Sequence, residues 1–155
     1  MKLVKTQNKD NHIDIKSILL IDDCDIDNFI SSRLIKKIHG AAEAICKTSA
    51  EEGLQYLQLG IEGKVEIPEI IFLDIRMPSM DGFEFLREFA KLNPNVKSKC
   101  SIFMLSSSID QRDIERAKKN PHVVDFITKP LSMDKLNNAL SAWKKQQSQS
   151  YQQSA

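Results

Sequence analysis

Residues 18–27 read ILLIDDCDID, an apolar run that leads straight into a cluster of acids. The run Ile18–Ile21 has the length of a strand and is apolar at every position, which is typical of a strand buried on both faces of a parallel sheet. Four aspartates follow it, at positions Asp22, Asp23, Asp25 and Asp27. Asp25 and Asp27 suit the start of a helix, where carboxylates cap backbone N–H groups and oppose the helix dipole. The stretch therefore predicts a buried strand and then a helix, with two further aspartates at the junction.

The overall composition limits the classes of function. The chain has 155 residues, enough for one domain with a full hydrophobic core. Its 22 lysines and arginines almost balance its 21 aspartates and glutamates, so no basic surface for direct nucleic-acid binding dominates. No apolar run has the length of a membrane span or a signal peptide, and three scattered cysteines suggest neither disulfides nor a zinc site. We expect a cytoplasmic protein without membrane contact, whose function comes from local groups of residues.

The two ends of the chain differ in composition from its middle. Residues 1–15 mix lysines with polar residues, and we expect them to form a flexible leader. Residues 146–155 (QQSQSYQQSA) are expected to form a disordered polar tail, because Gln and Ser cannot bury a core. The folded unit is then residues 16–145, and it contains no internal repeat.

Within the folded unit, strand-like runs alternate with helical patterns. The strand-like runs are Ser17–Ile21, Ala44–Lys47, Ile70–Leu73, Ile102–Leu105 and Val123–Ile127. The helical patterns cover 26–38, 49–57, 82–92, 110–119 and 136–143. Parallel neighbours need helical crossovers. Five strands and five helices therefore predict an α/β fold, a (βα)5 doubly wound, flavodoxin-like domain with a five-stranded parallel sheet. We expect the strand order 2-1-3-4-5, which is the common one for five strands.

Three of the predicted helices carry clear local signals. The first has apolar residues at three- and four-residue spacing, which places them on one face: Ile26, Phe29, Ile30, Leu34 and Ile38. The second opens on Ser49-Ala50-Glu51-Glu52, the pattern of a capping box. The third opens on Asp81-Gly82, which we interpret as a structural start to that helix, an acid followed by a flexible residue.

Polar residues follow several strands at the carboxyl edge of the sheet, where doubly wound folds place their ligand sites. They are Asp22 and Asp23 after the first strand, Asp74 after the third, Ser106 after the fourth and Lys129 after the fifth. In the order 2-1-3-4-5 the first and third strands are neighbours, so the three aspartates converge. Carboxylates that close repel one another unless a cation lies between them, and oxygen ligands suit Mg²⁺. Metal, carboxylate, hydroxyl and ammonium together indicate a phosphoryl-transfer site.

Five motifs, taken in order, resemble the receiver domain of two-component response regulators, of the single-domain, chemotaxis-regulator-like kind. They are Asp22-Asp23, Ile71–Pro78 (IFLDIRMP), Asp81-Gly82, Met104–Ser107 (MLSS) and Phe126–Pro130 (FITKP). The resemblance covers about Ser17 to Lys145. A single acidic pair or a lone Lys-Pro would be a weak signal, whereas five motifs near strand ends are a specific one.

The resemblance implies a role for each charged residue at the strand ends. Asp74 would accept a phosphoryl group. Mg²⁺ would be bound by Asp22, Asp23, Asp74 and the backbone carbonyl of Arg76. Lys129 would contact the phosphate, through a Lys-Pro peptide bond that is typically cis in the family.

Two further residues are implied to relay the signal. Ser106 matches the switch hydroxyl and Phe126 the switch aromatic, although Phe126 also fits an ordinary core residue. Their movement would change the surface that the fourth helix, fifth strand and fifth helix offer to a partner. The implied partners are a histidine kinase or histidine phosphotransfer protein and a downstream protein target. No effector domain follows residue 145, so we expect protein–protein signalling or a phosphorelay step rather than DNA binding, and a homodimer remains open.

Two other interpretations stay open. Asp23-Cys24-Asp25 after an apolar strand also fits the DxD signature of haloacid-dehalogenase-type phosphatases, which are enzymes that use an aspartyl phosphate, here Asp23, and Mg²⁺. Against it, no Gly-Thr follows the second aspartate and no acidic pair occurs late in the chain. The second is a receiver-like binding module that is never phosphorylated, but the complete set of site residues argues against it. We therefore expect a phosphoacceptor that phosphorylates and dephosphorylates itself and is not a turnover enzyme.

Overall fold

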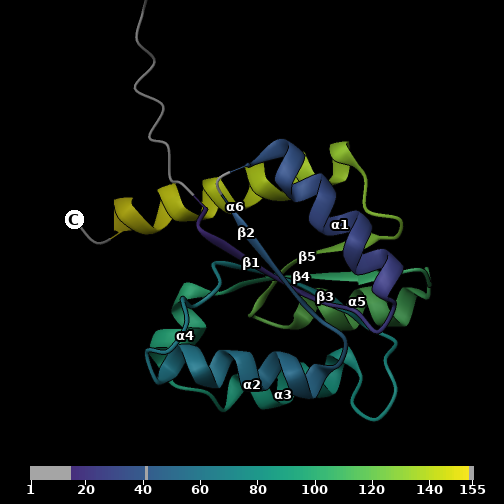
Figure 1. The fold of residues 1–155 in the computed structure, drawn as a ribbon, viewed down its shortest axis with the longest axis horizontal. Coiled ribbons are helices and arrows are strands. Elements are labelled where there is room, and N and C mark those ends of the chain that lie inside the picture. The colour runs from purple at the N-terminus through teal and green to yellow at the C-terminus, as the bar shows by residue number, and fades with distance from the viewer. Residues whose placement is uncertain (1–14, 41, 154–155) are drawn as a thin grey trace, which may run out of the picture.

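Five parallel strands form a single sheet in the computed structural model, which describes residues 15–40 and 42–153 (Figure 1). The strands are β1 (Ser17–Ile21), β2 (Glu43–Lys47), β3 (Ile70–Asp74), β4 (Ser101–Ser106) and β5 (Val123–Thr128). Their order across the sheet is β2-β1-β3-β4-β5, and every neighbouring pair is parallel. The predicted doubly wound α/β fold and its strand order are confirmed.

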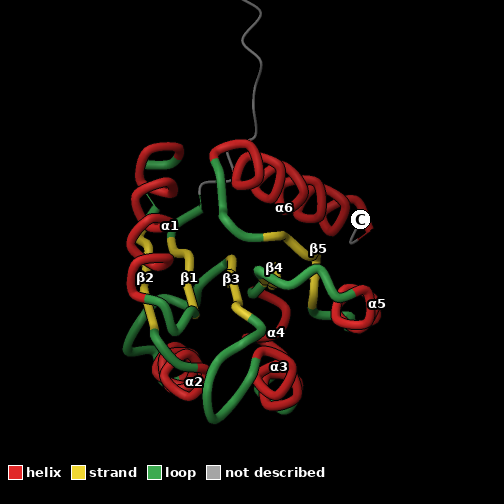
Figure 2. Tube along the Cα trace, turned by 90° about the vertical axis from the view of Figure 1, so that its right-hand side faces the viewer, coloured by secondary structure: helices red, strands yellow, loops and turns green. Residues whose placement is uncertain are grey.

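Helices cover both faces of this sheet, with α1 and α6 on one side and α2 and α3 on the other (Figure 2). Within the described residues the helices are α1 (Asp25–Ile38), α2 (Ala50–Ile61), α3 (Gly82–Ala90), α4 (Pro94–Lys99), α5 (Gln111–Lys119) and α6 (Met133–Gln153). The sequence predicted five helices, and the addition is α4. The third helix ends at Ala90 rather than Leu92, and Asn93 then caps a new helix that begins with Pro94. Proline suits the first turn of a helix because the N–H groups there have no partner within the helix, so the missing N–H of proline costs no hydrogen bond.

The central strands β1 and β3 are buried at every position, as predicted for strands covered on both faces. Each face of the sheet has its own apolar cluster. On the α2 and α3 side, Phe85 and Phe89 stack with their ring centroids 6.2 Å apart. On the α1 and α6 side, Leu136 and Trp143 are 0% and 2% exposed. The central strands β1 and β3 are therefore packed on both faces.

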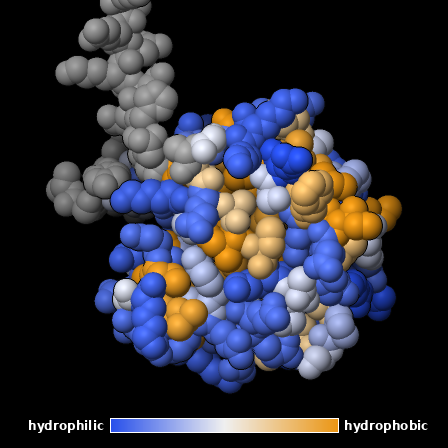
Figure 3. Space-filling model, in the orientation of Figure 1, coloured by the Kyte–Doolittle hydropathy of each residue, from blue (hydrophilic) through white to orange (hydrophobic). Residues whose placement is uncertain are grey.

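Helix α1 forms where the apolar spacing predicted it, but its apolar residues do not all face the sheet. Ile26, Phe29 and Ile30 are 68%, 59% and 47% exposed. The buried residues of the helix are Asn28, Ser31 and Ile35. The reason is that the start of α1 lies against the polar ends of β1 and β2, where a hydrogen-bonding side chain satisfies backbone groups that an apolar one would leave unpaired. In Figure 3 hydrophobic side chains are visible at the right-hand side of the molecule, over α1.

Both predicted chain ends need correction. Ile15, assigned to the leader, is 1% exposed and belongs to the core cluster beside α1 and α6; residues 1–14 lie outside the described residues. Residues 146–153 of the tail predicted to be disordered are instead helical, since α6 continues to Gln153; residues 154–155 lie outside the described residues. A helix already anchored by Trp143 extends at little cost through glutamines, which are good helix formers, and the Ser148 hydroxyl donates to the Lys144 carbonyl. Neither α6 nor any other described helix is long and apolar enough to cross a membrane.

Candidate functional site

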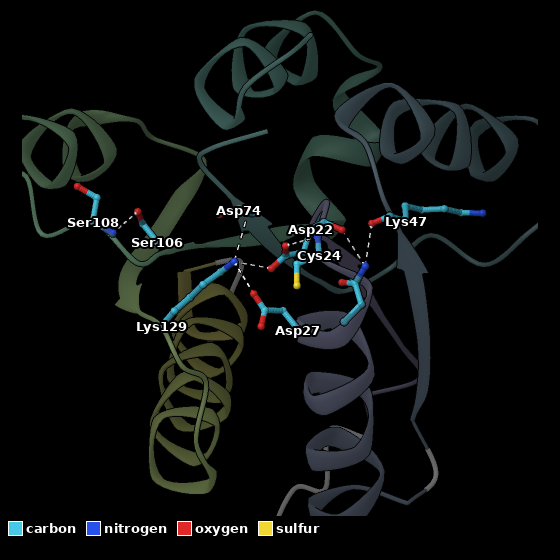
Figure 4. A network of polar contacts seen from close by, with 9 residues as sticks. Asp22, Cys24, Asp27, Lys47, Asp74, Ser106, Ser108 and Lys129 are labelled. Atoms are coloured by element: carbon cyan, nitrogen blue, oxygen red, sulfur yellow. Dashed lines mark hydrogen bonds and ion pairs between the residues drawn. The ribbon is translucent and has the colours of Figure 1, made fainter. Parts of the chain in front are cut away.

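Three carboxylates, those of Asp22, Asp23 and Asp74, meet at the carboxyl ends of β1 and β3. Figure 4 labels two of these residues, Asp22 and Asp74. Asp22 and Asp74 are each only 5% exposed, whereas Asp23 is exposed. One oxygen from each carboxylate lies within 4.8 Å of the other two. The structure therefore brings together the three aspartates that the strand order predicts to converge.

Asp22 is held by bonds to the start of α1 and the end of β2. Its N–H donates to the Lys47 carbonyl at 3.1 Å, and its Oδ1 accepts the N–H of Cys24 at 2.9 Å. The buried Asn28 amide donates to the carbonyls of Asp22 at 2.9 Å and Lys47 at 3.2 Å. Because Asn28 satisfies two backbone carbonyls at once, it joins β1, β2 and α1 at the site.

The loop after Asp74 runs close to the strand that precedes it. A Cβ at Gly82 would lie 2.6 Å from the Asp74 carbonyl oxygen, closer than Cβ atoms approach backbone, and 3.0 Å from the Ile75 Cα, which is a tight contact. The Gly82 N–H also donates to the Ile75 carbonyl at 2.9 Å, and the Asp81 carboxylate accepts the N–H of Glu84 to cap α3. The structural role predicted for Asp81-Gly82 is confirmed.

Lys129 reaches the acidic group from the end of β5. Its Nζ lies 2.6 Å from Asp22 Oδ2, 3.1 Å from Asp27 Oδ2 and 3.4 Å from Asp74 Oδ2. Its N–H donates to the Ser106 carbonyl at 2.9 Å, and its peptide bond to Pro130 is cis. The ammonium thus contacts three carboxylates, of which the sequence predicts two at this site.

The electrostatics of the site centre on Asp74 and Lys129. The pKa of Asp74 is raised to about 7, first because the carboxylate is buried and next because Asp22 is charged beside it, while Lys129 acts in the opposite direction. Burial lowers the pKa of Lys129, but the hydrogen bond to Asp22 and the charges of Asp74 and Asp22 outweigh it and raise that pKa above its ordinary value. A charged Asp74 is therefore unfavourable here unless further positive charge is supplied.

The donor set fits a hard divalent cation. Asp22, Asp23 and Asp74 offer carboxylate oxygens alone, the ligands that Mg²⁺ prefers. In the part of the chain that the structure describes, no other group of three or more His, Cys, Asp or Glu side chains is placed to hold a metal. A cation at this position would also offset the burial and the repulsion from Asp22 that raise the pKa of Asp74.

The three remaining predicted residues lie around this group. Ser106 is fully buried, and its hydroxyl accepts the N–H of Ser108 at 3.1 Å, toward the loop after β4 (Figure 4). Phe126 is half-buried against the apolar cluster on the α3 side. Arg76 turns its guanidinium to Asp113 of α5, 2.8 Å away. The switch roles of Ser106 and Phe126 and the metal-binding role of the Arg76 carbonyl stay predictions.

Two residues of the site escape sequence reasoning. The sequence assigns Asp27 to the start of α1, but its carboxylate also binds Lys129. The sequence predicts no role for Asn28, although it is 4% exposed and supports Asp22. The available signal is position alone, since both residues lie in the first turn of a helix that begins at the carboxyl edge of the sheet.

Comparison with known proteins gives the family. The response regulator receiver domain profile matches residues 18–141. The chain belongs to this family. The receiver is 32% identical to the chemotaxis protein CheY of Listeria monocytogenes over 123 residues, which are 79% of this chain and 93% of that protein. It is 35% identical to a two-component response regulator from Cytophaga hutchinsonii of known crystal structure, with a TM-score of 0.76 over 84% of this chain and 98% of that one.

Other relatives are longer than the receiver. A two-component response regulator of rice, Oryza sativa subsp. japonica, is 29% identical over 119 residues, which are 76% of this chain but 50% of the relative. The chain thus spans about half the length of that protein. The family match decides against the haloacid-dehalogenase-type alternative, and the roles of the individual strand-end residues stay predictions.

Proposed function

We propose that the receiver accepts a phosphoryl group on Asp74 from a phosphohistidine of a histidine kinase or histidine phosphotransfer protein. The observation that carries this proposal is the setting of Asp74, a buried carboxylate at the end of a central strand. The carboxylates of Asp22 and Asp23 form a group with it within 4.8 Å, and the Lys129 ammonium is 3.4 Å away. An oxygen nucleophile between a cation site and an ammonium is the arrangement that phosphoryl transfer requires.

In the proposed reaction an Asp74 oxygen attacks the phosphorus atom of the phosphohistidine. The bond from phosphorus to the imidazole nitrogen breaks, and its electron pair returns to that nitrogen. The second imidazole nitrogen carries a proton, so neutral histidine leaves and Asp74 becomes an acyl phosphate. Asp74 must be ionised to attack, and its pKa of about 7 makes this dependent on the cations around it.

Asp22, Asp23 and Asp74 would hold Mg²⁺ in the proposed site, with the Arg76 carbonyl as a further ligand. When bound, this ion would neutralise negative charge on the transferred group. Lys129 would supply the second positive charge, because its ammonium already lies 3.4 Å from Asp74. The buried backbone around Asp22, held by Asn28, keeps the carboxylates in place before any phosphoryl group arrives.

The proposed output is a change in the surface of α5, β5 and α6. A phosphoryl group brings about two negative charges, and the Ser106 hydroxyl would leave the Ser108 N–H to bind it. Phe126, already half-buried, would move inward behind it. Helix α5 is suited to respond because Ala117 is its only fully buried residue within the described chain. A downstream protein would read the altered surface.

The proposed donor is a protein, and α1 offers a surface for it. Ile26, Phe29 and Ile30 are exposed on this helix beside the site. Apolar side chains that are exposed together on one surface are a feature of protein contact sites. A donor that covers this part of α1 would bring its phosphohistidine to the carboxyl edge of the sheet.

The three cysteines are free thiols, which supports the cytoplasm as the proposed location.

The test is incubation with acetyl phosphate and Mg²⁺, followed by intact-mass measurement. Acetate leaves with the electron pair of the bond to phosphorus, and we expect a single base-labile phosphoryl group on the protein. It should be absent with EDTA and absent in Asp74→Asn, while Asp125→Asn, a control at an exposed position of β5, should behave as the wild type. An unmodified wild type would contradict the proposal and favour a binding module that is never phosphorylated.

An assay of phosphomonoester hydrolysis tests the alternative of a phosphatase that uses Asp23. Multiple-turnover hydrolysis of phosphomonoesters that is lost in Asp23→Asn but kept in Asp74→Asn would contradict the assignment of Asp74 as phosphoacceptor. We expect no such turnover.

A further inference from the structure

Asp27 binds Lys129 but does not belong to the proposed metal group. Its Oδ2 lies 3.1 Å from Lys129 Nζ, whereas the carboxylates that come together for a metal are Asp22, Asp23 and Asp74. Figure 4 shows the Asp27 side chain reaching from the first turn of α1 toward the ammonium, on the other side from Asp74. Lys129 is therefore drawn toward α1 as well as toward the phosphoacceptor.

Asp27 differs from the other two partners of Lys129 once a cation is present. Asp22 and Asp74 would share their negative charge with a metal, which weakens their attraction for the ammonium. Asp27 would not, because it stands outside the metal group. With a metal bound, Asp27 would therefore be the partner of Lys129 that keeps its full negative charge.

The ion pair between Asp27 and Lys129 lies where water can reach it and separate the two side chains. The Asp27 side chain is 44% exposed and that of Lys129 is 16% exposed. Both line a cleft of about 300 Å³ between α1 and the loop after β5, together with Ile30 and Pro130. An ion pair at the mouth of a cleft is weaker than a buried one, since water competes for both partners. Lys129 can thus exchange Asp27 for another anion without the helix moving.

We propose that Asp27 is a positioning residue that competes with the phosphoryl group at Asp74 for the Lys129 ammonium, and that it thereby slows phosphorylation of the receiver. This inference rests on the proposed function of Asp74 as phosphoacceptor. A phosphoryl oxygen must draw Lys129 away from Asp27 before the ammonium can stabilise the transferred charge. Without the charge of Asp27, Lys129 can bind the phosphoryl group without first breaking this ion pair.

The first experiment compares Asp27→Asn with Asp25→Asn. Both variants remove one carboxylate from the first turn of α1, but of the two residues only Asp27 is a partner of Lys129. Phosphorylation by acetyl phosphate with saturating Mg²⁺ is followed by intact mass. We expect the rate to rise about two- to tenfold in Asp27→Asn, and to stay near the wild-type rate or fall slightly in Asp25→Asn.

The second experiment repeats the substitution in a Lys129→Met background. Loss of the ammonium slows phosphorylation, but the carboxylates remain, so the slower reaction can be followed over a longer time. If Asp27 acts through Lys129, Asp27→Asn should have no effect on the rate in this background. A merely structural role for Asp27 would give the same change with and without Lys129.

The third measurement needs neither metal nor phosphoryl donor. The side-chain ammonium signal of Lys129 is followed by proton–nitrogen NMR in the metal-free protein, where its ion pairs slow exchange with water. We expect the signal to shift or broaden in Asp27→Asn and to stay in place in Asp25→Asn.

The outcomes separate this inference from the function on which it rests. A wild type that is not phosphorylated overturns both. A wild type that is phosphorylated, with Asp27→Asn no faster than Asp25→Asn, overturns only the role of Asp27. A rate increase that persists in the Lys129→Met background, or an unchanged Lys129 signal in Asp27→Asn, also overturns it.

Discussion

Helices α3 and α1 begin beside the same acidic site but bury opposite kinds of side chain. The buried residues of α3 are Gly82, Phe83, Phe85, Leu86 and Phe89. Those of α1 are Asn28, Ser31 and Ile35, while Ile26, Phe29 and Ile30 of this helix face solvent. Helix α3 thus contributes apolar packing, whereas the first turns of α1 contribute hydrogen bonds and an ion pair to the strand ends.

This difference indicates that α3 contributes mainly to the stability of the receiver, whereas α1 contributes mainly to the chemistry of its site. The site gathers like charges and by itself opposes folding, as the raised pKa of Asp74 indicates. The packing around α3 offsets that cost, so α1 can present polar groups to the site and apolar groups to the outside. Four substitutions test this division, and they follow from the largest expected effect to the smallest.

The largest effect is expected for Phe89→Ala in α3. Phe89 is 0% exposed and stacks on Phe85, so truncation removes a buried ring and leaves a cavity. We expect a loss of about 3 to 5 kcal/mol in the free energy of unfolding, measured by urea titration. A loss below about 1 kcal/mol would mean that α3 does not carry the stability that we assign to it.

The second effect concerns Asp74 and pH. The folded-state pKa of about 7 lies above the value near 3.9 expected in the unfolded chain. The folded protein therefore binds the proton more tightly, so this stabilising effect is complete below about pH 4 and is lost as pH rises through 7. Without divalent cations, Asp74→Asn should be more stable than the wild type at pH 8 by about 2 to 4 kcal/mol.

The control for this prediction is the same pair of proteins at pH 4, where the difference should nearly vanish. Urea titrations in EDTA across pH 4 to 8 measure it, and added Mg²⁺ should reduce the difference at pH 8 by stabilising the wild type. A wild type and variant of equal stability throughout would show that the strand-end charges do not oppose folding.

The third effect is expected for Asn28→Ala in α1. The substitution leaves the backbone carbonyls of Asp22 and Lys47 without their side-chain donor, and we expect a loss of about 1 to 3 kcal/mol in the free energy of unfolding. Binding of Mg²⁺, measured by titration calorimetry, should also weaken because Asp22 is less well held. Asn137→Ala at an exposed position of α6 is the control and should change neither quantity.

The smallest effect is expected for Phe29→Ala. This ring is 59% exposed and has the Arg33 guanidinium over it at 5.2 Å, so the free energy of unfolding should change by less than about 0.5 kcal/mol. The same truncation that is severe at Phe89 is thus nearly neutral on α1. A large loss of stability in Phe29→Ala would break the comparison between the two helices.

Much of this molecule can be predicted from local patterns. The apolar runs and the helical spacing predict all five strands and five of the helices, because strand and helix periods are properties of short segments. The carboxyl-edge rule then brings Asp22, Asp23, Asp74 and Lys129 to one place. Helix α4 and the helical end of the chain escape this reasoning, since a proline and a run of glutamines read as a break and a tail.

What the sequence alone determined is the parallel sheet and the acids that follow its strands, because the strand and helix periods are properties of short segments and ligand sites of such sheets lie at the carboxyl edge. The strand order is expected as the common one for five strands, and the structure confirms it. Tertiary packing decided the rest. It turned Asn28 inward and Phe29 outward on one helix, and it placed Asp27 against Lys129 across 102 positions of chain. Those outcomes depend on which unpaired backbone groups and which charges the neighbouring strands present, and no local pattern records them.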